Sequence, residues 1–162
     1  MYTKSYQLTE APKARVEMLV RRPVSEVFEA FVDPSITTRF WFTKSSGRLE
    51  PGRLVRWDWE MYGVFAEVKV IAVERDARIL LEWTGYDAPT VIEWIFTPRG
   101  DGATLVSITN SGFRGDGDDV VKQALGATGG FTLVLAGLKA LLEHGIALNL
   151  IADRFPDQLV RS

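Results

Sequence analysis

Few side chains in this chain could carry out chemistry. It holds one histidine, His144, and no cysteine among its 162 residues. Serine and cysteine nucleophiles need an imidazole to activate them. His144, however, precedes Gly145 where a helix is expected to end, and a cation-capable side chain there stabilises the last turn. Disulfides, thiolate metal sites and all-histidine metal sites are therefore excluded. We expect no catalytic residue, no metal and no cofactor.

Acidic side chains are the remaining candidates for acid–base or metal chemistry. Asp116, Asp118 and Asp119 could coordinate calcium, but their spacing does not fit an EF-hand loop. Aspartates just before an apolar helical pattern are typical of helix N-caps, so we expect Asp118 and Asp119 to cap a helix. Glu67 and Glu93 alternate with apolar residues, which indicates a solvated face. None of these acids predicts a catalytic pair.

Five tryptophans are the most distinctive feature of the composition. Trp57, Trp59, Trp83 and Trp94 fall on the apolar side of alternating segments, and Trp41 lies near the end of a short helix, beside the expected mouth of any cavity. Stacking on a flat ligand is one interpretation. Filling the core is favoured, because buried aromatic side chains dominate core energetics.

Asn110 and Thr104 are polar residues on the apolar face of one predicted strand. A buried amide without a partner costs about 1–3 kcal/mol, so both side chains need hydrogen bonds. Either they bond to neighbouring backbone, or they face a polar group of a ligand. The sequence leaves both alternatives open.

The spacing of apolar residues predicts the elements that position these side chains. After a first strand, one helix begins at Pro23 and a second covers Pro34–Phe40, and a long helix runs from about Asp118 to His144. Between them, alternating segments joined by short turns predict an antiparallel meander. The expected strands are 16–20, 47–50, 53–60, 64–74, 78–83, 90–97 and 103–110.

Length and charge predict one domain over 1–162, with a polar leader over 1–13. Nineteen basic and twenty-one acidic residues give a net charge of -2, which does not favour a nucleic-acid surface. The chain has neither an unbroken apolar run of about eighteen residues nor a signal-like start. We therefore expect a cytoplasmic protein without a membrane partner. Residues 146–162 are too apolar to extend into solvent, and we expect this tail to pack on the body or on a second subunit of a homodimer.

The order of these motifs resembles a known superfamily. The carrying segments are Arg22–Pro34, Arg39–Phe42, Arg78–Trp83, Gly102–Phe113 and Leu138–Gly145. Together they resemble the START-like, birch-pollen-allergen-like helix-grip domains, also called SRPBCC. Within these, the chain is most similar to the branch homologous to the C-terminal domain of the heat-shock protein 90 ATPase activator.

The resemblance implies an α+β helix-grip fold. A curved antiparallel sheet of about six or seven strands would wrap around the long C-terminal helix, with two short helices after the first strand. Several members of the superfamily hold lipids, sterols, polyketides or plant hormones between sheet and helix. Many carry a histidine where this chain has Thr109–Asn110, so a catalytic role is not carried over.

The expected ligand cavity lies where small residues of the long helix face the large aromatic residues of the sheet. The adjacent Gly129 and Gly130 cost about 1 kcal/mol each relative to alanine. They indicate a kink or a close approach to the sheet, and the functional alternative is a hinge that lets the first half of the helix move when a ligand enters. The candidate cavity residues are Trp41, Trp57, Trp59, Trp83, Trp94, Phe96, Thr104, Ile108, Asn110, Ala124, Ala127 and Phe131.

These residues support three hypotheses of function. The leading one is a non-catalytic binding domain that holds a small apolar or amphipathic molecule in the cavity. The first alternative is a cochaperone-like domain that contacts a chaperone ATPase and regulates it. The second is a polyketide cyclase-like enzyme, for which Asn110 is the main polar candidate.

Overall fold

The computed structural model describes residues 6–84 and 88–160. Part of the polar leader 1–13 and the last two residues of the tail 146–162 lie outside these ranges. The strands are β1 (Ala14–Val20), β2 (Lys44–Ser45), β3 (Leu54–Trp59), β4 (Val64–Glu74), β5 (Arg78–Trp83), β6 (Thr90–Pro98) and β7 (Thr104–Ser111). The helices are α1 (Val24–Val32), α2 (Pro34–Thr37), α3 (Gly117–His144) and α4 (Leu150–Arg154), with 3₁₀ turns η1 (Glu60–Tyr62) and η2 (Pro156–Gln158).

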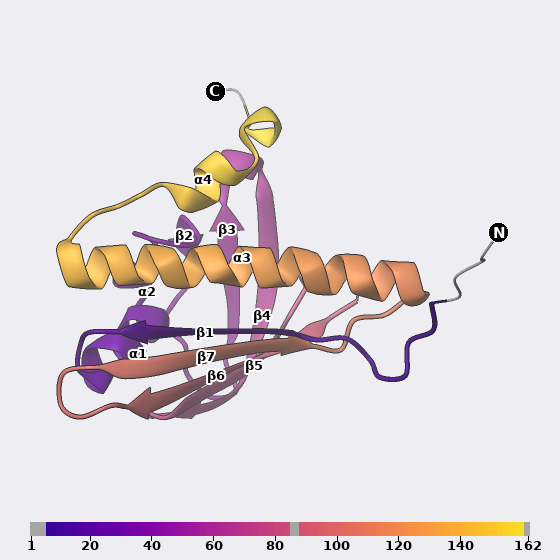
Figure 1. Cartoon of the computed structure of the whole chain (residues 1–162). Helices are drawn as coiled ribbons and strands as arrows, with labels where there is room; N and C mark the ends of the chain where they lie inside the picture. The colour runs from indigo at the N-terminus through magenta and orange to yellow at the C-terminus, as the bar shows by residue number, and fades with distance from the viewer. Residues whose placement is uncertain (1–5, 85–87, 161–162) are drawn as a thin grey trace.

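The strands form one seven-stranded antiparallel sheet, and the long helix α3 lies across it (Figure 1). The strand order is β1-β7-β6-β5-β4-β3-β2, so consecutive strands are neighbours except that β1 closes against β7. A register shift between Val70 and Ala72 of β4 bends the sheet. The predicted α+β helix-grip fold is confirmed.

Alternation sets the buried face of the sheet. In β7, Thr104, Val106, Ile108 and Asn110 are buried, while the residues between them are half-buried. A side-chain period of two sends one set toward α3 and the other outward. The same pattern buries one side of β3 and β6. The sheet therefore presents an apolar face that the long helix must cover.

Helix α3 meets this face with one apolar stripe. Its buried residues include Phe131, Val134, Leu135 and Leu138. By length and composition α3 could cross a membrane, because an 18-residue stretch of it has a mean hydropathy of 1.6. Here that stripe packs on the sheet instead, as in the core helix of a soluble protein.

Both ends of α3 are capped, by aspartates at the start and by a glycine at the end. The expected capping by Asp118 and Asp119 is confirmed in part: Asp116 is the N-cap, Asp119 completes a capping box with it, and Asp118 lies in the first turn. The Asp116 carboxylate accepts a hydrogen bond from Asp119 N (2.9 Å), and the Asp119 carboxylate accepts one from Asp116 N (3.1 Å). This reciprocal capping box satisfies two donors that the first turn leaves unpaired. At the other end Gly145 has φ 67°, a left-handed conformation that favours glycine.

Two short elements differ from the sequence predictions. The strand expected at residues 47–50 does not form. A short strand, β2, lies before it at Lys44–Ser45. Leu49 is buried and its N–H donates to Val32 O (3.2 Å), which draws this segment toward α1. Helix α2 ends at Thr37 and not at Phe40 as expected. The Thr37 hydroxyl at this end donates to the carbonyl oxygen of Ala30 (2.6 Å) in the buried interior.

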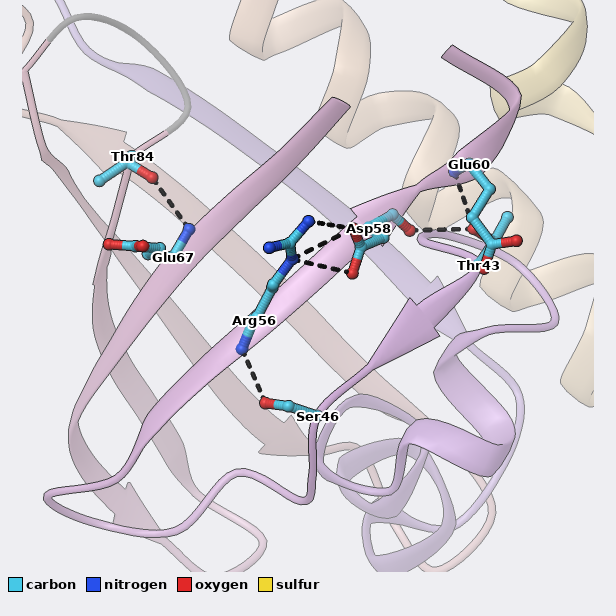
Figure 2. A network of polar contacts seen from close by, with 7 residues as sticks. All are labelled: Thr43, Ser46, Arg56, Asp58, Glu60, Glu67 and Thr84. Atoms are coloured by element: carbon cyan, nitrogen blue, oxygen red, sulfur yellow. Dashed lines mark hydrogen bonds and ion pairs between the residues drawn. The ribbon is translucent and has the colours of Figure 1, made fainter. Parts of the chain in front are cut away.

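Side chains fix the edge of the sheet that carries β2 (Figure 2). The Thr43 hydroxyl donates to Asp58 O (3.0 Å) and accepts from Glu60 N (2.9 Å). The Ser46 hydroxyl accepts from Arg56 N (2.8 Å). These bonds hold the chain on both sides of β2 against β3. They thereby fix the segment that begins with Trp41.

Glu143 ties the end of α3 to the end of β1. Its carboxylate accepts from Arg21 N (2.9 Å) and from Lys139 Nζ (2.6 Å), and Lys139 Nζ also donates to Leu19 O (2.8 Å). Burial raises the pKa of Glu143, but the hydrogen bonds from Arg21 and Lys139 outweigh it and leave the pKa below its ordinary value of 4.5.

We expect Glu143→Gln to lower the free energy of unfolding at pH 7 by about 1–2 kcal/mol, since hydrogen bonds to a charged group are lost. A lowered folded-state pKa means that this stability is complete above pH 4.5 and is lost as pH falls through the folded pKa. The difference from wild type should shrink in urea titrations below that pH. Glu26→Gln, which removes an exposed ion pair with Arg22 (3.8 Å), should change little. A pH-independent difference would contradict this account.

Candidate functional site

Trp41 stands at the centre of the aromatic cluster. Its ring centroid lies 4.9 Å from that of Trp57 and 6.1 Å from that of Trp94. On the helix side, the centroid of Phe131 is 5.8 Å away. Phe42 stacks on Trp57, with centroids 4.6 Å apart. Trp57 and Trp94 are each 1% exposed, so Trp41 and Phe42 fill the space above these two sheet tryptophans.

Beyond this cluster, an apolar pocket of about 380 Å³ opens beside the middle of α3. Its sheet wall is formed by Trp41, Trp59, Tyr62, Val64, Phe65, Ala66 and Trp83. Its helix wall is formed by Gly126, Ala127, Gly130 and Phe131. Its third wall comes from the C-terminal segment, through Ile151, Arg154, Phe155 and Gln158. A volume of this size lies in the range of small-molecule sites.

The structure divides the twelve candidate cavity residues into two groups. Five line the pocket: Trp41, Trp59, Trp83, Ala127 and Phe131. Seven are buried without lining it: Trp57, Trp94, Phe96, Thr104, Ile108, Asn110 and Ala124. The pocket therefore lies toward β3, β4 and the C-terminal segment, away from β7.

The two polar candidates are bonded within the protein. The Thr104 hydroxyl donates to Arg22 O (2.9 Å). The Asn110 amide nitrogen donates to Thr90 Oγ1 (3.0 Å) and Val91 O (2.9 Å). Among the described residues, Asn110 Oδ1 and Trp94 Nε1 are buried without a hydrogen-bond partner. Of the two alternatives left open by the sequence, the observed bonds match bonding within the protein, to β6 for Asn110 and to the loop after β1 for Thr104.

The C-terminal segment folds back beside α3, on the side away from β1 (Figure 1). Tyr62 anchors it: its hydroxyl hydrogen-bonds to the carbonyl oxygens of Ile151 and Ala152 (3.1 Å to the latter), and Phe155 N donates to that hydroxyl (3.3 Å). Val160 N then donates to Met61 O (2.8 Å). These bonds make the segment a wall of the pocket.

Arg154 lies against the two adjacent glycines of α3. Its guanidinium lies so close to the helix that a Cβ added at Gly129 would be 2.7 Å from Nη2, and one added at Gly130 would be 3.0 Å from Nη1. The close approach expected at this pair was to the sheet, and the structure instead places an arginine of the C-terminal segment there. Arg154 also donates to Gly126 O (3.3 Å) and lies over the Phe155 ring, 4.8 Å from its centroid.

The electrostatics around the pocket are simple. Arg154 is the one charged residue among the described residues that line it. Shifted pKa values belong to ion pairs elsewhere: the hydrogen bond with Arg48 lowers the pKa of Glu29, and the hydrogen bond with Glu93 raises the pKa of Arg78. Over residues 6–84 and 88–160, no group of three or more His, Asp or Glu side chains could hold a metal ion.

The pocket contains residues that the sequence reasoning did not select. Tyr62 sits in η1, a segment interpreted as a turn, and Phe65 points outward by alternation. Arg154 and Phe155 belong to the tail. The apolar character of that tail was the one available signal, because it indicated a segment that must cover something.

A curved sheet gripping a long helix, with an apolar pocket between them and the C-terminal segment, defines a START-like domain of the SRPBCC superfamily. Within it, residues 21–143 match the family described as Activator of Hsp90 ATPase homolog 1-like protein. The chain belongs to this family. No match was found among curated proteins.

Solved structures agree with this assignment. Protein SSP2350 from Staphylococcus saprophyticus is 34% identical over 84% of this chain and 95% of its own, with a TM-score of 0.72. DynU16, from the dynemicin biosynthetic locus, is 26% identical over 84% of this chain and 49% of its own, with a TM-score of 0.70. The Aha1 dimer from Colwellia psychrerythraea is 17% identical over 82% of this chain and 97% of its own, with a TM-score of 0.67, and shows the shared fold.

Proposed function

We propose that this protein is a non-catalytic binding domain for a small apolar or amphipathic molecule. The observation that carries the proposal is the pocket of about 380 Å³, which aromatic side chains line on the sheet side and Ala127 and Gly130 line on the helix side. Small residues on one wall leave room against large rings on the other, which is typical of ligand sites. Balanced charge and the lack of cysteine favour the cytoplasm as its location.

The chemistry of the lining supports binding over catalysis. The described lining residues include no Asp, Glu, His or Lys, so none of the usual general acids or bases other than tyrosine faces the pocket. Tyr62 is engaged with carbonyl groups of the C-terminal segment. For a polyketide cyclase-like enzyme, Asn110 was the polar candidate. Its amide is bonded inside the sheet and it does not line the pocket.

Ala127→Trp tests the proposal. The added indole should occupy the pocket, so we expect the melting temperature to hold or rise while binding of decanol, measured by calorimetry, is lost. If the space around Ala127 were filled, the larger side chain would strain the core and cost about 1–3 kcal/mol.

The matched control is Ala124→Trp, one turn earlier on α3 and outside the pocket lining. It should keep decanol binding. Native mass spectrometry of the purified wild-type protein would add a direct search for a bound molecule. Destabilisation by Ala127→Trp together with no decanol binding by wild type would abandon the ligand-binding proposal.

A second candidate is a protein-interaction role, favoured by the family and by the outer surface of the sheet. Leu54 is 75% exposed and Ile71 is 43% exposed, so the outer face of β3 and β4 carries apolar side chains that a partner could cover. A chaperone ATPase or a second copy of the chain would be the partner. Leu54→Asp should then weaken co-sedimentation with a purified Hsp90-type ATPase, or shift self-association, without affecting decanol binding.

A further inference from the structure

The pocket has one feature that an apolar site does not need, a guanidinium group in its C-terminal wall. Arg154 is half-buried, and no carboxylate within residues 6–84 and 88–160 lies in ion-pair range of it. Its contacts in the described structure are the long hydrogen bond to Gly126 O (3.3 Å) and the ring of Phe155. Most of its five N–H donors thus remain available to an acceptor.

Two glycines of α3, Gly129 and Gly130, lie next to the Arg154 guanidinium. A glycine inside a helix costs about 1 kcal/mol relative to alanine, and α3 carries two at the point where Arg154 lies. A Cβ at Gly129 would meet Nη2 at 2.7 Å. The two glycines therefore leave room for the guanidinium beside α3 at the pocket rim. A bound anion would pair with the N–H donors that Arg154 does not use within the described structure.

We infer that the ligand is an amphipathic acid, whose apolar body fills the aromatic part of the pocket and whose carboxylate pairs with Arg154. This inference rests on the proposed function and names the class of its ligand. A planar guanidinium binds a carboxylate through two parallel hydrogen bonds. The aromatic walls formed by Trp59, Trp83 and Phe131 would hold the apolar body. The C-terminal segment therefore supplies the specificity of the site.

The test compares two probes of the same length, decanoate and decanol, by calorimetry at pH 7. Wild type should bind decanoate about tenfold more tightly or better, the ratio expected for one charge-assisted pair of about 1.4 kcal/mol. Arg154→Gln should remove that preference, because it should lower decanoate affinity about tenfold more than decanol affinity. Gly129→Ala keeps the arginine but displaces its guanidinium, so it should also weaken decanoate selectively.

Lys122→Gln is the matched control, because it removes one positive charge from an exposed position of α3, the helix against which Arg154 lies. It should leave the preference unchanged. Equal affinities of wild type for both probes, or equal losses of both in Arg154→Gln, would overturn this inference while leaving the proposed function standing. Binding of neither probe by wild type would overturn both.

Discussion

Trp94→Ala should lower the free energy of unfolding by about 3–5 kcal/mol, the usual cost of deleting a large buried aromatic side chain. Trp94 is 1% exposed. Its ring centroid lies 5.7 Å from that of Phe31, 6.1 Å from that of Trp41 and 6.5 Å from that of Phe131. Its removal would leave a cavity where α1, the segment after α2 and α3 meet the sheet. Urea denaturation measures the loss.

Ile95 provides the control on the same strand. It is 37% exposed and lies on the opposite face of β6, so Ile95→Ala should cost less than about 1 kcal/mol. The contrast between neighbouring positions tests the strand phase directly. A loss under about 1 kcal/mol for Trp94→Ala would mean that the indole does not belong to the core.

Asn110→Asp should be nearly as damaging at pH 7, with an expected loss of about 3–5 kcal/mol. Asn110 is fully buried, and its amide nitrogen donates to Val91 O at 2.9 Å. A carboxylate there would place a buried negative charge against a carbonyl oxygen. The side chain has nearly the same shape, so the effect reports charge and hydrogen bonding rather than packing.

Ser111→Asp, the next residue on the other face of β7, should change stability by less than about 1 kcal/mol. The cost of Asn110→Asp should also fall at acidic pH, because a protonated carboxyl group can donate a hydrogen bond again. Thermal melts at pH 7 and pH 4 compare the two variants. An Asn110→Asp protein as stable as wild type at pH 7 would show that this amide has a polar environment instead.

The sheet could be predicted well because its signal is local. Trp57, Trp94 and Ile108 each follow a period of two within their own strand, and that period alone decides which face is buried. The end of α3 at Gly145 could also be predicted from the sequence, since a left-handed residue after a helix favours glycine. The short strand β2 was wrongly predicted at 47–50, because a strand of two residues, Lys44 and Ser45, is too short to show a periodic pattern.

The pocket was harder to predict because its boundaries depend on which distant segments meet. Alternation places Trp57 and Trp59 on the same face, yet Trp41 and Phe42 cover the first and leave the second at the pocket. Arg154 lies against α3 in a segment that Tyr62 holds through bonds to the carbonyl oxygens of Ile151 and Ala152. Those contacts join residues about ninety positions apart, and no periodicity within one segment reports such a meeting.

The pairing of the first strand with the last has a consequence for how the protein is made. Ala14 of β1 lies opposite Asn110 of β7, so during synthesis β1 has no strand partner until β7 has been translated. Before that point, the strands from β3 onward can pair in sequence order. The pocket is completed later still, when the C-terminal segment up to Gln158 has been made. Any ligand of this pocket can stabilise the fold by mass action only once the C-terminal segment has also been made.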